Sequence, residues 1–277
     1  MENKKSYNTV AAVIVAGAML ISQPSLAQTV SLSSGGSSAD VVLSGAGAGM
    51  NSWYVDTAPS ANQLNKQWFY YRIGNGLAQP INTIGGLTYT TVGTDTLEAI
   101  YSNSQFSLTI SYVLSGGGTG TGNADIQETI SVLNTSGSAL DFHLFQYSDF
   151  NLLGSPGGDS VVIGGSGGFY NSVLQWDGMT GISESITTPP ADRAEAALAF
   201  TTLANLNSIP GYDLNNNTGP LSGDVTWSFQ WDRIIPNNES LDVFKDKQMS
   251  IAPVPEPSVL ALIGAGLIAL GLRRKHN

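Results

Sequence analysis

Hydrophobic and polar residues alternate over much of this chain, which is the pattern of half-buried β-strands. The clearest example is residues 106–114, where every second residue is apolar: Phe106, Leu108, Ile110, Tyr112 and Leu114. Residues 225–231 repeat the pattern with larger side chains: Val225, Trp227, Phe229 and Trp231. Two tryptophans on one face of a strand can bury a large apolar area, so we expect this segment to anchor a core.

Residues 65–74 differ from this pattern because apolar and aromatic residues occupy both alternating sets. Trp68 and Tyr70 fall on one face of a strand, and Phe69 and Tyr71 fall on the other. A strand that is covered on both faces has this composition. We therefore expect residues 65–74 to form a central strand.

Further segments have the length and the flanking turn residues of strands. Residues 124–133 and 139–149 flank the polar turn Asn-Thr-Ser-Gly, which predicts a β-hairpin, and residues 241–251 predict a last strand. Residues 193–205 fit either a helix by propensity or a strand by alternation. Together the segments predict an all-β fold, a single antiparallel β-sandwich of jelly-roll or Ig-like type.

Two ionisable residues of the expected hairpin are candidates for chemistry. Glu128 shares a face with Ile130, and a carboxyl buried there would have a raised pKa and could act as a general acid. We favour the alternative, in which Glu128 is solvated or pairs with Arg72 or Arg193. His143 shares a face with Phe145, Tyr147 and Asp149, and we favour a hydrogen-bonded structural role for it over catalysis.

The N-terminal end has the parts of a secretory signal peptide. Basic residues Lys4 and Lys5 precede an apolar segment at residues 10–21, and small residues follow it. We expect signal peptidase to cleave between Ala27 and Gln28. The apolar segment is shorter than the roughly 20 residues of a comfortable membrane span, which favours removal over a permanent anchor.

The C-terminal end also has three parts in a fixed order. Pro255, Glu256 and Pro257 come first, and the two prolines hold this segment extended. Residues 258–272 are apolar and would form a helix of about 22 Å, which is short of the roughly 30 Å hydrocarbon core. A basic cluster follows: Arg273, Arg274 and Lys275. We expect a short transmembrane helix with a cytoplasmic stop.

This order of parts resembles the PEP-CTERM sorting signal. The resemblance implies that exosortase, a membrane protease-transferase, cleaves near Pro255-Glu256-Pro257 while the helix holds the chain transiently in the inner membrane of a Gram-negative bacterium. It also implies delivery to the cell surface or extracellular matrix, with exopolysaccharide as a candidate partner. The expected organisation is a signal peptide at residues 1–27, a β-sandwich at 28–251 and the sorting signal at 252–277.

Composition narrows the partners of the central domain. The formal net charge of −10 does not favour binding to the negatively charged phosphate backbone of nucleic acid. The chain has no cysteine, and His143 is the only histidine before the tail, so neither a disulfide framework nor a usual zinc site is expected. We expect no cofactor, apart from a calcium candidate with part of the EF-hand spacing: Asp213, Asn215, Asn217 and Asp224.

These features favour an exported cell-surface or exopolysaccharide-matrix protein without catalytic activity. An alternative is a carbohydrate-binding module, in which exposed indole rings of Trp53, Trp68 and Trp176 stack on sugars. A second alternative is a glycan-active hydrolase or lyase, which needs two carboxyl groups roughly 5 to 9.5 Å apart. The sequence identifies no such pair, so it assigns no catalytic residue.

Overall fold

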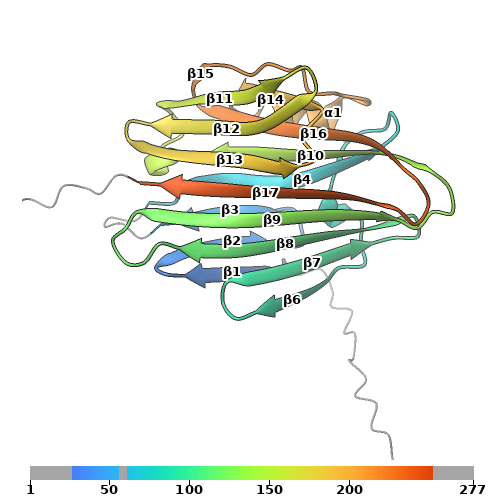
Figure 1. The fold of residues 1–277 in the computed structure, drawn as a ribbon, viewed down its shortest axis with the longest axis horizontal. Helices are drawn as coiled ribbons and strands as arrows, with labels where there is room; N and C mark the ends of the chain where they lie inside the picture. The colour runs from blue at the N-terminus through green and yellow to red at the C-terminus, as the bar shows by residue number, and fades with distance from the viewer. Residues whose placement is uncertain (1–26, 56–60, 252–277) are drawn as a thin grey trace, which may run out of the picture.

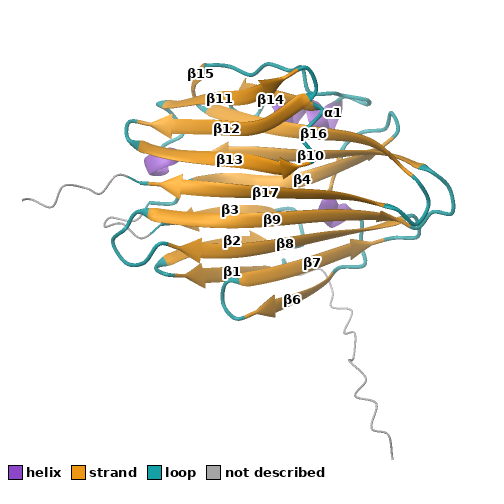
Figure 2. Ribbon diagram, viewed as in Figure 1, coloured by secondary structure: helices purple, strands orange, loops and turns teal. Residues whose placement is uncertain are grey.

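The computed structural model describes residues 27–55 and 61–251. These residues form two antiparallel β-sheets that pack face to face, here named sheet A and sheet B (Figure 1). Figure 1 looks onto sheet B with sheet A behind it, and Figure 2 shows that strands make up most of the domain. The predicted all-β class with antiparallel sheets is confirmed.

Sheet A has eight strands, which lie in the order β1 (Thr29–Ser34), β2 (Ser37–Val42), β3 (Gly49–Tyr54), β4 (Leu64–Ile73), β10 (Leu140–Phe150), β16 (Val225–Ile235) and β14 (Arg193–Leu198), with β5 (Gln79–Pro80) beside β4. Sheet B has nine strands, which lie in the order β15 (Leu221–Gly223), β11 (Asp159–Ser166), β12 (Phe169–Asp177), β13 (Thr180–Thr188), β17 (Ser240–Ser250), β9 (Asn123–Asn134), β8 (Phe106–Gly116), β7 (Thr96–Ser102) and β6 (Thr88–Val92). The helical elements of the described residues are α1 (Thr201–Ser208) and the 3-10 turns η1 (Ile81–Thr83) and η2 (Leu152–Gly154).

The sandwich is not of the expected jelly-roll or Ig-like type. Each sheet alone, with eight or nine strands, holds about as many strands as a whole Ig-like domain, which has roughly seven to nine, or a whole jelly roll, which has roughly eight. Consecutive strands lie side by side from β1 to β4 in sheet A and from β6 to β9 in sheet B. These meanders account for the width of both sheets.

Strand β16 anchors the core, as its alternation predicts. Trp227, Phe229 and Trp231 are buried, and the ring of Trp227 stacks on Phe150 at a centroid distance of 6.0 Å. β4 lies between β3 and β10 with buried residues on both faces, which confirms it as a central strand. Because successive side chains of a strand point to opposite faces, these strands also carry a second set of residues on the outer face of sheet A.

Residues 124–133 and 139–149 form strands, but the predicted hairpin between them is wrong. β9 pairs with β8 and β17 in sheet B, whereas β10 pairs with β4 and β16 in sheet A. The turn therefore crosses between the sheets, and the Asn134 amide holds it by donating to Ser138 O and Ile235 O, each at 2.7 Å. Each strand thereby packs its apolar face against the opposite sheet.

Residues 193–205, which fitted either a helix or a strand, contain one of each. Strand β14 ends at Leu198 and helix α1 begins at Thr201. Ala199 separates them with a φ of 46°, in the left-handed region that reverses the chain direction. Because the segment contains a short strand followed by a short helix, neither pattern extends over its whole length.

Within residues 27–55 and 61–251, no helix is long and apolar enough to cross a membrane. Residues 1–26 of the expected signal peptide and the expected helix at residues 258–272 lie outside the described residues. Gln28, expected as the first residue after cleavage, already takes part in the fold. Its N–H donates to Ser44 Oγ at 3.0 Å, and its carbonyl accepts from Leu43 N–H at 2.6 Å.

Four charged side chains lie between the two sheets with no exposed surface: Glu128 of β9, Glu184 of β13, and Lys245 and Lys247 of β17. We call them the core quartet. Lys247 Nζ lies 2.7 Å from Glu128 Oε1 and 2.9 Å from Glu184 Oε2. Lys245 Nζ forms an ion pair with Glu128 Oε2, and Gln146 of β10 donates to Glu184 Oε2 at 2.9 Å.

Strand register builds the quartet. Glu128 lies opposite Lys245 across β9 and β17, and Glu184 lies opposite Lys247 across β13 and β17. The solvated or arginine-paired Glu128 that we favoured is therefore wrong, because its partners are lysines. Burial alone would raise the pKa of Glu128, but the charges of Lys245 and Lys247 outweigh burial and lower it. Two cations and two anions leave this part of the core without net charge.

Removing one cation of the quartet should strongly destabilise the domain. In Lys247→Met, Glu128 and Glu184 share one lysine in an apolar site, and breaking a buried ion pair costs about 3–5 kcal/mol. We expect the free energy of unfolding, measured by urea denaturation, to fall by that amount. Asp242→Asn alters an exposed side chain of the same strand and serves as the control. A loss below about 1 kcal/mol in Lys247→Met would contradict this account of the core.

Candidate functional site

Charged side chains from four neighbouring strands meet on the outer face of sheet A. Arg72 of β4 lies opposite His143 of β10, and His143 lies opposite Asp232 of β16. Arg193 of β14 reaches Asp232 with its Nε at 3.5 Å. His143 points outward because its sequence neighbour Phe142 is buried between the sheets.

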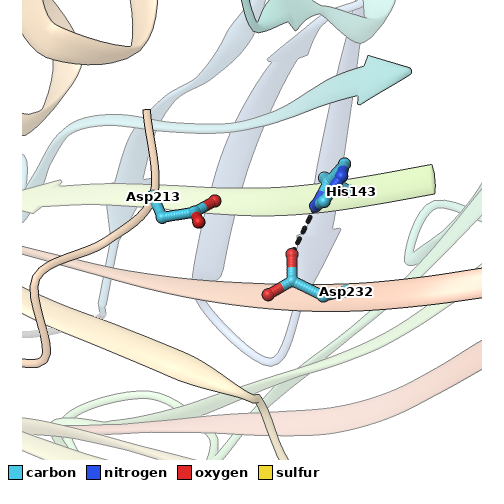
Figure 3. Close-up of side chains that lie close together, drawn as sticks. All are labelled: His143, Asp213 and Asp232. Atoms are coloured by element: carbon cyan, nitrogen blue, oxygen red, sulfur yellow. Dashed lines mark hydrogen bonds and ion pairs between the residues drawn. The ribbon is translucent and has the colours of Figure 1, made fainter. Parts of the chain in front are cut away.

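Asp213 reaches the same place from the loop that follows α1. Figure 3 shows Asp213 beside His143 and Asp232, whose side chains point toward each other from adjacent strands. We call His143, Asp213, Asp232, Arg72 and Arg193 the outer-face cluster. The face predicted for His143, shared with Phe145 and Tyr147, is confirmed.

His143 has a carboxylate at each ring nitrogen. Its Nδ1 lies 2.5 Å from Asp232 Oδ1, and its Nε2 lies 3.5 Å from Asp141 Oδ1. A ring anchored at Nδ1 keeps a fixed orientation, so Nε2 can give or take a proton from a defined direction. The contacts suit both roles that the sequence left open, a structural histidine and a proton-transfer group.

Gln230 of β16 joins the loop to the sheet beneath the cluster. Its Nε2 donates to Asp213 Oδ1 and to Asp232 Oδ1, each at 2.7 Å, and its Oε1 accepts from Leu214 N–H at 2.8 Å. Gln230 is buried, so these hydrogen bonds are shielded from water. The position of Asp213 relative to Asp232 is therefore fixed by one amide group.

The environment of Asp232 favours its ionised form. Burial alone would raise its pKa, but hydrogen bonds from His143 and Gln230, with the charges of His143 and Arg193, outweigh burial and lower it. Asp232 is therefore a carboxylate throughout the neutral pH range. Its negative charge faces the ring that it holds.

The cluster is open to ligands on its outer side. The exposed fraction is 13% for the side chain of His143, 29% for Asp232 and 39% for Arg193. Arg72 is buried beneath them, and its Nη1 donates to Tyr212 O at 2.6 Å. The site therefore has a rigid floor and accessible donor and acceptor groups.

Ligand atoms of His143, Asp213 and Asp232 lie within 4.8 Å of one another, a spacing that a metal ion could bridge. Arg72 Nη2 already lies 2.9 Å from Asp213 Oδ1, and Arg193 approaches Asp213 and Asp232 at 3.5 Å. These guanidinium groups neutralise the carboxylates and would repel a second cation. The cluster suits proton transfer and hydrogen bonding to hydroxyl groups better than metal binding.

The contacts of the predicted calcium loop do not favour calcium. Asp213 belongs to the outer-face cluster. Asn215 Oδ1 accepts from Asn217 N–H at 2.8 Å, and Asn217 Oδ1 accepts from Gly219 N–H at 3.3 Å. These turn bonds occupy both amide oxygens. A calcium site at Asp213, Asn215, Asn217 and Asp224 stays a prediction.

Two of the three predicted stacking tryptophans are in the interior. Trp53 and Trp68 have exposed fractions of 0% and 1%, and their indole N–H groups donate to Ser37 Oγ and Asn82 Oδ1, each at 3.1 Å. Neither ring can form an exposed platform for sugars. Trp176 of β12 is partly exposed, but it lies on the outer face of sheet B, away from the outer-face cluster.

Asp232 is the member of the cluster that sequence reasoning missed. It continues the polar set of β16 after Ser228 and Gln230, so the alternation does indicate its outward face. No pattern in the sequence joins it to His143, because the contact spans 89 residues.

Residues 253–275 match the PEP-CTERM protein-sorting motif. This match confirms the resemblance, and it implies export, membrane-associated sorting and processing by exosortase. Pro255, Glu256 and Pro257, with the basic residues after them, lie outside the described residues. No curated protein sequence matches this chain.

The fold is similar to solved structures of carbohydrate-active proteins. A candidate aldose 1-epimerase from Escherichia coli K12 has a TM-score of 0.55 at 12% identity, over 82% of this chain and 99% of that chain. A galactose mutarotase-like protein from Clostridium acetobutylicum has a TM-score of 0.53 at 12% identity, over 81% and 96%. A bacterial glucoamylase complexed with acarbose has a TM-score of 0.56 at 7% identity, over 82% and 34%. At these identities the likeness shows the fold.

These neighbours contradict the function favoured from the sequence, a surface or matrix protein without catalytic activity. That prediction is wrong, because the domain shares its fold with galactose mutarotase-like proteins. The two alternatives, a binding module and a hydrolase or lyase, also did not anticipate it. The sequence did not indicate this site because the residues of the outer-face cluster come from strands and a loop that lie far apart along the chain.

Removing the His143 ring should raise the pKa of Asp232. In His143→Phe the hydrogen bond and the charge of His143 at Asp232 are lost, so burial, which raises the pKa of Asp232, is opposed less strongly. Carbon-13 NMR titration of the Asp232 carboxyl measures the change in pKa. A carboxyl whose folded pKa is depressed stabilises the fold above its unfolded pKa, and that stability is lost as the pH falls through the folded pKa. Acid denaturation should therefore depend less on Asp232 in the variant. An unchanged titration would contradict the assigned contact.

Proposed function

We propose that this chain is an exported protein that binds an aldose at the outer-face cluster and interconverts its two anomers. The observation that carries the proposal is a pair of proton-transfer groups on a galactose mutarotase-like sandwich. His143 Nε2 and Asp141 Oδ1 lie 3.5 Å apart on the outer face of sheet A. The candidate aldose 1-epimerase among the structural neighbours supports this class of reaction.

Interconversion of anomers requires two proton transfers, one at each of the two oxygens bonded to the anomeric carbon C1. A base takes the proton from the hydroxyl oxygen O1, an acid protonates the ring oxygen, and the bond from C1 to the ring oxygen breaks. Rotation of the resulting aldehyde and ring closure give the other anomer. Because both oxygens are bonded to C1, an acid and a base only 3.5 Å apart can each reach one of them.

The other members of the site position these groups and the sugar. Asp232 holds Nδ1 of His143 at 2.5 Å, so Nε2 is the nitrogen that faces the sugar. Asp141 is half exposed and can accept a proton from a hydroxyl group. Arg193 and Asp213, both partly exposed, offer a donor and an acceptor to further hydroxyl groups of the ring.

The purified mature protein should accelerate the change in optical rotation of freshly dissolved α-D-glucose or α-D-galactose. Loss of one general acid–base group lowers the rate by about 10²- to 10⁴-fold. We expect His143→Ala and Asp141→Asn each to lower kcat/KM in this range. Polarimetry, or proton NMR of the anomeric signals, measures the rate.

Asp242→Asn is the matched control because Asp242 is an exposed carboxylate on the outer face of sheet B. Its rate should equal that of the original protein. A wild-type protein that leaves the rate at the buffer value with both sugars would overturn the proposed reaction. Equal rates in His143→Ala and wild type would overturn the assigned site.

We further propose the route by which the domain reaches its place of action. Signal peptidase cleaves between Ala27 and Gln28, and exosortase processes the tail near Pro255-Glu256-Pro257, so the domain is delivered to the cell surface. The match of residues 253–275 to the sorting motif supports the second step.

Mass spectrometry of the mature protein from a host with exosortase and from a matched host without it tests this route. We expect a C-terminus near Pro255 in the first host and a longer chain in the second, because only exosortase removes the tail. A chain that still ends at Asn277 in both hosts would contradict the processing step.

A further inference from the structure

The core quartet contains a pair whose geometry suits a covalent bond as well as an ion pair. Lys245 and Glu128 face each other across β17 and β9, and Lys245 Nζ contacts Glu128 Oε2. Neither side chain has exposed surface, so water does not compete for either group. Glu184 Oε2 lies 3.5 Å from the same Nζ.

We propose that Lys245 and Glu128 condense to an amide, which cross-links β9 and β17 within the chain. The Nζ atom of Lys245 attacks Cδ of Glu128, the N–C bond forms, and one C–O bond of the carboxyl group breaks. Two protons of the ammonium group leave with that oxygen as water, and the remaining proton stays on the amide nitrogen. The step needs no oxidant, reductant or cofactor.

The neighbouring groups supply the proton transfers. Attack requires a neutral amine and a neutral carboxyl group, and both form when Lys245 passes one proton to Glu128 Oε2 across their contact. Burial lowers the pKa of Lys245, which favours this transfer. Glu184 takes a proton from Nζ and returns it to the departing oxygen. Lys247 Nζ, 2.7 Å from Glu128 Oε1, stabilises the negative charge that develops on this oxygen during attack.

The product fits the core better than four separate ions do. Condensation removes one cation and one anion together and leaves Glu184 paired with Lys247 at 2.9 Å. A neutral amide costs less free energy to bury than two ions. The bond also spans 117 residues in a chain without cysteine, and a cross-link of this length restricts the unfolded chain as a disulfide does.

Trypsin digestion of the denatured full chain tests the bond directly. No lysine or arginine lies between Arg72 and Arg193, so trypsin releases residues 73–193, which include Glu128, as one fragment. Trypsin does not cleave after an acylated lysine, so Lys245 would remain within residues 234–247. We expect mass spectrometry to find these two segments joined and lighter by one water than their sum. A free 73–193 fragment together with cleavage after Lys245 would overturn the proposal.

Two variants test the roles within the quartet. Glu184→Gln keeps the size of the side chain but cannot carry the proton, so we expect this variant to yield the free 73–193 fragment. Asp242→Asn on the same strand as Lys245 should stay cross-linked. Full cross-linking in Glu184→Gln would overturn the role of Glu184. The digestion of wild-type protein decides the bond itself, whether or not a variant folds.

Discussion

Charge balance inside the sandwich is the constraint on which the rest of this structure depends. Glu128 and Glu184 come from strands on either side of β17, and Lys245 and Lys247 of β17 lie between them. A buried ion without its partner is strongly destabilising, so β9, β17 and β13 are compatible with the core in one register. A slip of β17 by one residue would turn both of its lysines to the solvent face and leave Glu128 and Glu184 buried without partners. The quartet thus specifies the middle of sheet B.

Strand β10 links the core quartet to the outer-face cluster, because it contributes a residue to the surroundings of each. Gln146 points inward and donates to Glu184 at 2.9 Å, while His143 on the other face of the strand contacts Asp232 at 2.5 Å. Since side chains alternate along a strand, the register that satisfies Gln146 also determines where His143 stands. β4 and β16 pair with β10 on its two sides and carry Arg72 and Asp232 to the cluster. The polar site therefore rests on strands that the core holds fixed.

Alternation predicted β8, β16 and β4 because a strand records its buried face in its own residues. It did not predict that β9 and β10 belong to different sheets, because the turn after Asn134 has the composition of a hairpin turn and of a crossover. It left the inward face of Glu128 as the less favoured alternative and did not indicate its lysine partners. For the outer-face cluster, it gave the face of His143, whereas the contact with Asp232 depends on pairing across 89 residues. The face on which a side chain lies follows from its neighbours along the strand, whereas its contact partners depend on the register between paired strands.

The sorting tail follows directly on the strand that supplies both cations of the quartet. Ile251, just after β17, is buried, and its N–H donates to Gly122 O at 2.7 Å. Cleavage at or beyond Pro255 removes no residue of β17, so both lysines keep their partners. Cleavage within β17 before Lys247 would remove this lysine and leave Glu184 without its nearest cation. The placement of the Pro-Glu-Pro segment beyond Ile251 therefore allows a removable tail to be joined to a strand that the core cannot lose.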